Sequence, residues 1–288
     1  NNQVYPFEQF DLLYNRPDKI IAQISENEEL VTLYEAAYNK RIQNTGPTLK
    51  NSYNLSDIPT VQWDNPPDYP ETNNASLSLT YTAKANKNDL KKIQLWINNV
   101  PLFGIAGKGV SGRNISKTEQ VTLSVGSNKI ELSVTDNAGI ESLRKSFVIT
   151  YNPDTLVKQS LHIVALAVSD YDGQENDLKY AVKDGRDFIE SFLQNHSKYA
   201  SITVDSLFDN EVTQNNLGRI KSNLKNSKVD DAVVVFVAGH GLLDTAYNFY
   251  YATPTCNFKQ PSEGGISYTN IESLLDNIPA RKKLLLMD

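Results

Sequence analysis

The sequence of 288 residues predicts an α/β domain with a largely parallel sheet flanked by helices, preceded by an all-β sandwich and a short N-terminal helical segment. Two observations lead to this division. Residues 59–152 contain short stretches in which apolar and polar side chains alternate, as they do in strands with one buried face. Residues 153–288 contain continuous apolar stretches separated by helical patterns, as expected for parallel strands buried on both faces.

The N-terminal segment, residues 1–58, is expected to be helical or to serve as a linker. Pro17 suits the first turn of a helix, and the apolar spacing predicts one helix over residues 18–39. The Asn-Thr-Gly-Pro stretch at residues 44–47 should end this helix. The segment is too short to build a core alone, so we expect it to dock on another part of the protein.

The β region, residues 59–152, shows its clearest alternation at residues 75–83. The remaining strands and turns are expected at regular spacing, which favours a β-sandwich. Strands are predicted at residues 92–100, 120–125, 130–134 and 146–151, with turns at 126–128 and 136–139.

The last region, residues 153–288, should contain four strands with three helices between them. The strands are predicted at residues 161–168, 202–208, 231–237 and 283–287. Asn176 or Asp177 is expected to cap the first helix, Thr213 the second, and a Thr269–Glu272 capping box the third. This order implies a parallel sheet, whose active site would lie at the carboxyl ends of the strands.

Composition restricts the kinds of partner. Apolar residues make up 40% of the chain, yet no apolar run reaches the roughly 20 residues of a membrane helix, so no membrane partner is expected. A net charge of −6 disfavours nucleic acid as a partner. The excess of acidic residues in 153–288 suits a cationic substrate or a solvated surface.

The single cysteine, Cys256, excludes a disulfide framework within these residues. The histidines are too scattered for metal-ligand spacing, and we expect no metal and no cofactor.

A histidine between two glycines, His240, directly follows the third predicted strand. Such a residue is exposed to a cleft and could transfer protons near neutral pH. Taken alone, the pattern is also that of an ordinary loop histidine beside turn glycines. Asp288 follows the fourth strand at the same edge of the sheet, either as a site residue or as a strand-end carboxylate.

These features together resemble the caspase-like superfamily of cysteine peptidases (clan CD), particularly metacaspases and related bacterial proteins. The likeness covers about the last 130 residues. In the β region, the stretch from Gly126 to Gly139 resembles the end of bacterial immunoglobulin-like domains. The stretches similar to the caspase-like superfamily are Asp170-Tyr-Asp-Gly173, Leu178-Lys-Tyr-Ala-Val-Lys-Asp184, Asp230 to Gly241, and Leu284-Leu-Leu-Met-Asp288.

The resemblance implies a cysteine endopeptidase with a Cys–His dyad. His240 would assist the thiol and protonate the leaving amine, and the backbone N–H of Gly241 would stabilise the oxyanion. The family's nucleophilic cysteine would stand two places after Asp288, where this sequence stops. We therefore expect residues 1–288 alone to be inactive and to need the remaining C-terminal part of the peptidase domain as a partner.

The resemblance also implies a preference for peptide or protein substrates with Arg or Lys at P1. Asp288 and Asp184 match the two acidic walls of the metacaspase S1 pocket, although Asp184 could instead be a solvated helix carboxylate. Ala238 stands where the family usually has a serine, so one pocket hydrogen bond should be missing. Calcium activation is not expected, because Asp244 stands almost alone after the histidine. Residues 247–258 should instead form an aromatic hairpin.

Three further interpretations remain open at this level. Cys256 lies away from the expected nucleophile position and is interpreted as a packing residue. The acidic loop at residues 170–177 could bind a cation or simply be solvated. The whole domain could be a catalytically inactive caspase-like adaptor, whereas a serine hydrolase using His240 is disfavoured because no Gly-x-Ser-x-Gly elbow is present.

Overall fold

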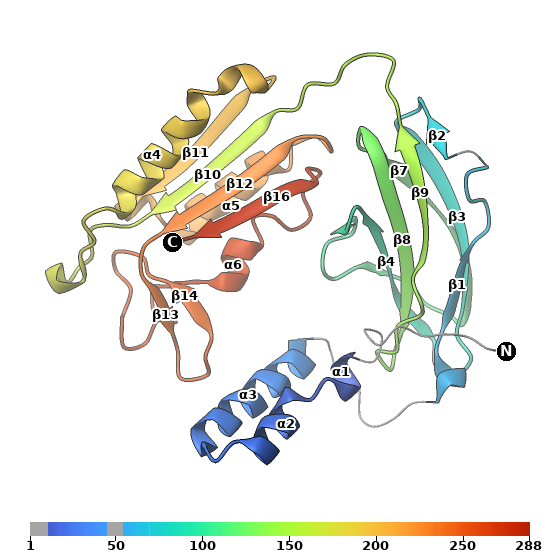
Figure 1. Ribbon diagram of the computed structural model, residues 1–288, viewed down its shortest axis with the longest axis horizontal. Coiled ribbons are helices and arrows are strands. Elements are labelled where there is room, and N and C mark those ends of the chain that lie inside the picture. Colours follow the sequence, from blue (N-terminus) through green and yellow to red (C-terminus); the bar gives the residue numbers. More distant parts are fainter. Residues whose placement is uncertain (1–10, 45–53, 69) are drawn as a thin grey trace. The chain divides into compact units, whose positions relative to one another are not determined.

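The computed structural model describes residues 11–44, 54–68 and 70–288 (Figure 1). The chain divides into two compact units. One comprises Asn1–Val121 and Ser127–Thr150, and the other comprises Thr122–Gly126 and Tyr151–Asp288. In the described part of the chain, no helix has the length and apolar character needed to cross a membrane.

The N-terminal segment forms three helices: α1 (Asp11–Tyr14), α2 (Pro17–Ile24) and α3 (Glu28–Asn44). The prediction of one helix over residues 18–39 is wrong, because the backbone becomes extended at Ser25. The carboxamide of Asn27 then accepts the N–H of Leu30 at 3.0 Å, as a helix N-cap does, and α3 packs against α2. The break predicted at residues 44–47 falls largely outside the described residues.

The β unit contains two sheets with the strand orders β1-β3-β7 and β2-β9-β8-β4-β5, and β6 pairs with β4 (Figure 1). Their inward side chains form the core, which includes Leu79, Tyr81, Leu95 and Leu132. An all-β region is therefore confirmed. The strands are β1 (Thr60–Trp63), β2 (Glu71–Thr72), β3 (Ser76–Lys84), β4 (Leu90–Ile97), β5 (Val100–Pro101), β6 (Lys108–Gly109), β7 (Asn114–Thr122), β8 (Gly126–Asp136) and β9 (Lys145–Tyr151).

Three details of the β prediction are wrong. The strand expected at residues 92–100 is interrupted, because β4 ends at Ile97 and Asn98 and Asn99, both with positive φ, turn the chain into the antiparallel β5. The strand expected at residues 120–125 is β7, which begins at Asn114 and ends at Thr122; its first half is polar and showed no apolar signal. The turn expected at residues 126–128 is the start of β8, where Gly126 adopts a φ of +86°. The turn at residues 136–139 is confirmed, since the N–H of Gly139 bonds the carbonyl of Asp136 at 3.0 Å.

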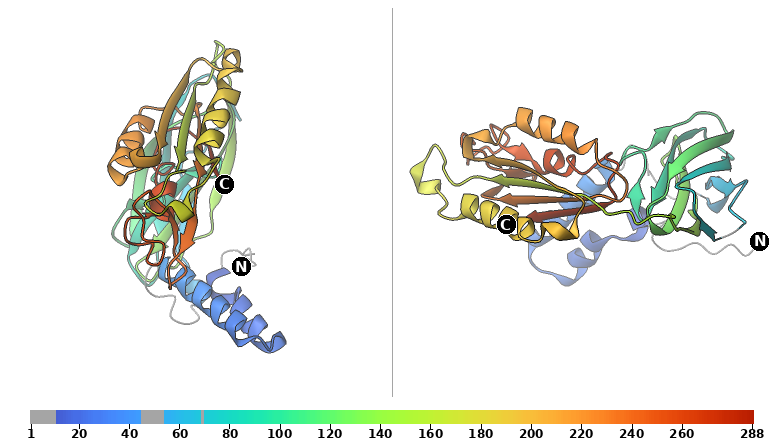
Figure 2. Two further views of the ribbon diagram at one scale, coloured as in Figure 1. Left: turned by 90° about the vertical axis from the view of Figure 1, so that its left-hand side faces the viewer. Right: turned by 90° about the horizontal axis from the view of Figure 1, so that it is seen from above.

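The second unit is built on a four-stranded sheet of order β11-β10-β12-β16, and all its neighbouring strands are parallel, as predicted. Helix α4 packs on one face, while α5 and α6 pack on the other (Figure 2). The elements are β10 (Leu161–Ala167), α4 (Ala181–Leu193), β11 (Ile202–Phe208), α5 (Gln214–Leu224), β12 (Ala232–Ala238), α6 (Tyr268–Glu272) and β16 (Lys282–Met287).

The helix starts in this unit agree only partly with prediction. Thr213 caps α5, accepting the N–H of Asn216 at 3.2 Å. Asn176 and Asp177 do not cap α4: they precede it, and the carboxylate of Asp177 accepts the N–H of Tyr171 at 2.8 Å. The Thr269–Glu272 capping box is also wrong, because both residues lie inside α6 and Ser267 is its N-cap, accepting the N–H of Asn270 at 3.3 Å.

A small antiparallel sheet follows His240. It consists of β13 (Gly241–Leu243), β14 (Phe249–Tyr251) and β15 (Ile266–Ser267). The hairpin therefore spans β13 and β14 rather than residues 247–258, with the carboxylate of Asp244 accepting the N–H groups of Ala246 and Asn248 in its turn.

Candidate active site

A pocket of about 340 Å³ lies at the carboxyl ends of β12 and β16, beside the first turn of α4. Four of the site residues expected from sequence line it: His240, Asp184, Asp288 and Ala238. These residues come from three elements that are distant in sequence, and the parallel sheet brings them together. The complete lining is Leu178, Lys179, Tyr180, Ala181, Asp184, Ala238, Gly239, His240 and Asp288.

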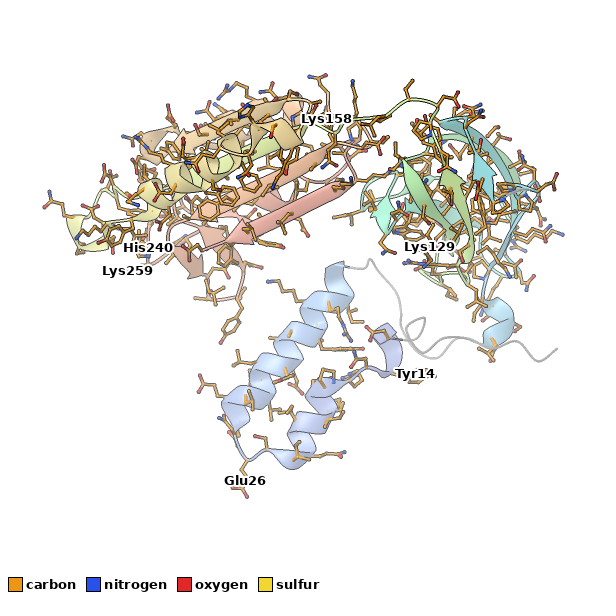
Figure 3. All side chains as sticks on the ribbon, turned by 45° about the horizontal axis from the view of Figure 1, so that its top comes forward. Tyr14, Glu26, Lys129, Lys158, His240 and Lys259 are labelled. Carbon is orange, nitrogen blue, oxygen red and sulfur yellow. The ribbon has the colours of Figure 1, made fainter. Side chains whose placement is uncertain are left out.

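The imidazole of His240 has a defined hydrogen bond. Its Nε2 lies 2.8 Å from the backbone carbonyl oxygen of Asn176. A carbonyl oxygen only accepts, so Nε2 must carry a proton, and in the neutral ring Nδ1 is then the basic nitrogen. The ring is also packed between two aromatic side chains, with centroids 5.1 Å from Tyr171 and 5.3 Å from Phe258. It lies at the end of the sheet, near the loop that carries Lys259 (Figure 3).

Two buried tyrosines hold the backbone around His240. The Tyr171 hydroxyl accepts the N–H of His240 at 3.1 Å and donates to the carbonyl of Val168 at 3.3 Å. The Tyr251 hydroxyl donates to the carbonyl of Ala238 at 2.8 Å. Burial raises the pKa of both hydroxyls, which therefore stay protonated as donors at neutral pH. The histidine loop is thus fixed by contacts from two different elements.

Both glycines that flank His240 are required by close neighbours. Gly239 has a φ of +147°, and a Cβ there would lie 2.9 Å from Cε2 of Tyr251. A Cβ on Gly241 would lie 2.5 Å from Cε2 of Phe249. Real Cβ atoms do not approach neighbours this closely, so the Gly-His-Gly stretch allows the tyrosine and phenylalanine rings to pack against the loop.

Gly241 does not line the pocket, but the direction of its N–H follows from the hairpin pairing. The N–H of Ala252 bonds the carbonyl of His240 at 2.9 Å, and Gly241 lies opposite Tyr251. Hydrogen-bonded and non-bonded pairs alternate along an antiparallel ladder, so the N–H of Gly241 points away from β14. That direction leaves the group available to an oxygen atom outside the sheet.

The acidic side of the pocket comes from Asp184 and Asp288. Asp184 is half-buried in the first turn of α4, where its own N–H bonds the carbonyl of Tyr180 at 2.8 Å. Asp288 follows β16, and its N–H bonds the carbonyl of Val237 at 2.8 Å. Ala238 is buried and contributes a methyl group rather than a hydroxyl.

Sequence reasoning missed two side chains of the pocket wall, Lys179 and Tyr180. Both are exposed, and the Lys179 ammonium lies 5.2 Å from the centroid of the Tyr180 ring. They stand between the short 3₁₀ turn Gln174–Asn176 and α4, so their position depends on a loop conformation that has no periodic signal.

Cys256 is buried in the core of the α/β unit. Its Sγ lies 3.8 Å from the carbonyl oxygen of Pro261, and burial raises the pKa of the thiol. A raised pKa disfavours the thiolate that a nucleophile needs, so the environment suits a packing residue. Within residues 11–44, 54–68 and 70–288, no group of three or more His, Cys, Asp or Glu side chains is placed to hold a metal ion.

Among the comparisons with known proteins, only the one with solved structures gives matches. No family model matches the chain, and no curated protein matches it. A structure of fibronectin(III)-like modules of Clostridium thermocellum CbhA is 18% identical with a TM-score of 0.26, covering 33% of this chain and 47% of that one. The chain thus spans about half the length of that structure.

Two further structures show similarly low scores. The PKD domain of an M14-like peptidase from a Thermoplasmatales archaeon is 14% identical, with a TM-score of 0.23 over 34% of this chain and 94% of that one. The SrpA adhesin of Streptococcus sanguinis is 9% identical, with a TM-score of 0.25 over 81% and 98%. At these scores the description of both units rests on their strand pairing.

Proposed function

We propose that the α/β unit belongs to a cysteine endopeptidase of the caspase-like superfamily that cleaves after Arg or Lys, and that the β unit is its immunoglobulin-like companion domain. The pocket supports the proposal best. It joins one histidine of defined tautomer to two carboxylates contributed by separate elements. A proton carrier beside a cation-binding pocket is the arrangement that such a peptidase requires.

The chemistry assigns a role to each nitrogen of His240. Nδ1 takes the proton of the cysteine thiol while Nε2–H stays bonded to Asn176. The thiolate attacks the peptide carbonyl, and the imidazolium returns the proton to the leaving amine. The resulting thioester is hydrolysed by water, which His240 deprotonates in turn. The Gly241 N–H donates to the oxyanion, because it points away from the hairpin.

The nucleophilic cysteine would come from a segment other than residues 1–288. Cys256 is the one cysteine here, and it is buried. We propose that the segment continuing from Asp288 supplies the nucleophile and pairs with β16. In the part of the chain that the structure describes, β16 has β12 as its single sheet neighbour and exposes Leu284, Leu286 and Met287.

The substrate preference follows from the charge of the pocket. Asp184 and Asp288 provide acceptors for a guanidinium or ammonium group, and hydrogen bonds between such ions are stronger than neutral ones. Ala238 provides an apolar contact for the stem of the side chain. A P1 Arg or Lys therefore fits, whereas an acidic P1 residue would be repelled.

The second candidate is a catalytically inactive adaptor that binds basic peptides through the same pocket. The burial of Cys256 favours it, because these residues then hold no accessible thiol. The two candidates differ at one position, namely the residue two places after Asp288, where a cysteine supports the peptidase.

The test uses a version of the protein that continues past Asp288. It should cleave Arg- and Lys-containing peptides, and His240→Ala should reduce cleavage by at least about a hundredfold, the usual contribution of an acid–base group. His196→Ala is the matched control, since His196 is exposed beyond the end of α4 and should tolerate the change. Cleavage after Asp would contradict the pocket assignment, and full activity of the His240 variant would contradict the dyad.

A further inference from the structure

The pocket carries unpaired charges of both signs. Asp184, Asp288 and Lys179 all line it. In the described part of the chain, none of the three forms an ion pair with another side chain. The ammonium of Lys179 is instead near the exposed ring of Tyr180, at 5.2 Å from its centroid. The pocket wall therefore contains two carboxylates and one ammonium group that are not paired with one another.

The neighbouring lysine, Lys183, has its side-chain hydrogen-bond partner outside the pocket, and the charge of Asp184 acts on it as well. Lys183 pairs with Asp187 one turn along α4, and the hydrogen bond to Asp187 raises the pKa of its ammonium. Lys183 does not line the pocket, so Lys179 supplies the ammonium group of its wall. A ligand with only a positive charge would satisfy Asp184 and Asp288 but would be repelled by Lys179.

A ligand with a cation and an anion close together would satisfy both kinds of group, because each charge would meet its opposite. We propose that Lys179 makes this pocket selective for a basic residue accompanied by a carboxylate. The cation binds at Asp184 and Asp288, and the carboxylate binds Lys179. The carboxylate comes either from an acidic residue adjacent to the Arg or Lys, or from the α-carboxylate of a C-terminal basic residue. This inference rests on the basic-residue pocket of the proposed function.

The experiment measures binding to residues 1–288, so it needs no nucleophile. Backbone amide NMR shifts near the pocket are followed during titration with acetyl-arginine amide and with acetyl-arginine, which differ in the α-carboxylate. Two further pairs are dipeptides blocked at both ends. In one pair Asp or Asn directly follows the arginine, and in the other pair Asp or Asn directly precedes it. The carboxylate forms should bind about 1.5- to 5-fold tighter than their neutral partners, the range of an exposed ion pair.

The variants identify the source of the preference. Lys179→Gln should bring the ratio within each pair to about one, with acetyl-arginine amide binding unchanged or tighter. Lys183→Gln removes an equal charge nearby but outside the pocket wall, so the ratios should persist. A preference in the α-carboxylate pair alone indicates C-terminal basic residues, and one in a dipeptide pair indicates an acidic neighbour.

Two results would overturn the inference, and they separate it from the proposed function. In the first result, acetyl-arginine amide binds at the pocket, but no carboxylate form binds more tightly, or the preference for the carboxylate form persists in Lys179→Gln. Lys179 then does not select the anion, and the pocket for the basic residue is unaffected. If acetyl-arginine amide causes no shifts around Asp184 and Gly239, the basic pocket itself is wrong, and the inference fails with it.

Discussion

Removing one hydroxyl beneath the histidine loop tests whether that loop is held by the surrounding fold. Tyr171→Phe keeps the ring that packs on His240 and Phe258, but it deletes the atom that accepts the His240 N–H. Tyr171 is 6% exposed, so water does not readily replace the lost acceptor. A buried donor left without a partner costs about 1–3 kcal/mol, and the carbonyl of Val168 loses its bond to the hydroxyl as well.

The assay must report on the α/β unit alone. Both tryptophans, Trp63 and Trp96, belong to the β unit, so tryptophan fluorescence would report the wrong transition. Hydrogen exchange of the buried amides in β10 and β12 instead reports the opening of the parallel sheet. A loss of 1–3 kcal/mol would speed their exchange by about 5- to 150-fold.

Tyr268→Phe is the matched control, because that side chain is 40% exposed and its ring contact with Phe249 survives the change. It should alter exchange by less than about twofold, as surface substitutions usually do. If the buried amides of Tyr171→Phe exchange as slowly as those of the control, the reasoning is refuted. The hydroxyl would then contribute nothing to holding His240.

Two further predictions concern stability. Gly239→Ala should destabilise the α/β unit by about 1–3 kcal/mol, because φ is +147° and the new Cβ would meet Tyr251. Gly218→Ala, in open space on α5, should stabilise it by about 0.5–1 kcal/mol in the same exchange assay. Burial opposes ionisation of Asp231, but hydrogen bonds from the backbone N–H groups of Lys228 and Ser160 and from His162 hold its pKa below the usual value. The ionised form thus stabilises the fold above pH about 4, and this contribution is lost as the pH falls through the lowered pKa. Asp231→Asn should flatten that part of the stability–pH curve of the α/β unit, measured by urea unfolding followed at the backbone amides of β10 and β12, and an unchanged curve would contradict the assignment.

The parallel sheet was predictable because its signal is local and strong. In β10, six of seven residues are buried, and the exception, His162, lies 3.4 Å from the carboxylate of Asp231. A mostly apolar run of strand length between turn or helix signals is typical of a parallel strand buried on both faces. The helix starts were less predictable. Asn176, Asp177 and Ser25 are all compatible with capping or with helix. In the structure the carbonyl of Asn176 bonds the distant His240, Asp177 accepts the N–H of Tyr171 within the same loop, and the backbone becomes extended at Ser25.

The site was predictable where residue type and position within the topology agree. His240 and Asp288 directly follow neighbouring parallel strands, so the sheet itself brings them to one edge. Tyr171, Tyr251 and Lys179 gave no such signal, because each acts through a side chain that crosses to another element or lines a loop-built wall. It follows that topology can locate a candidate centre in this fold, whereas the tautomer of its histidine and the charge balance of its pocket depend on loop geometry that only the structure supplies.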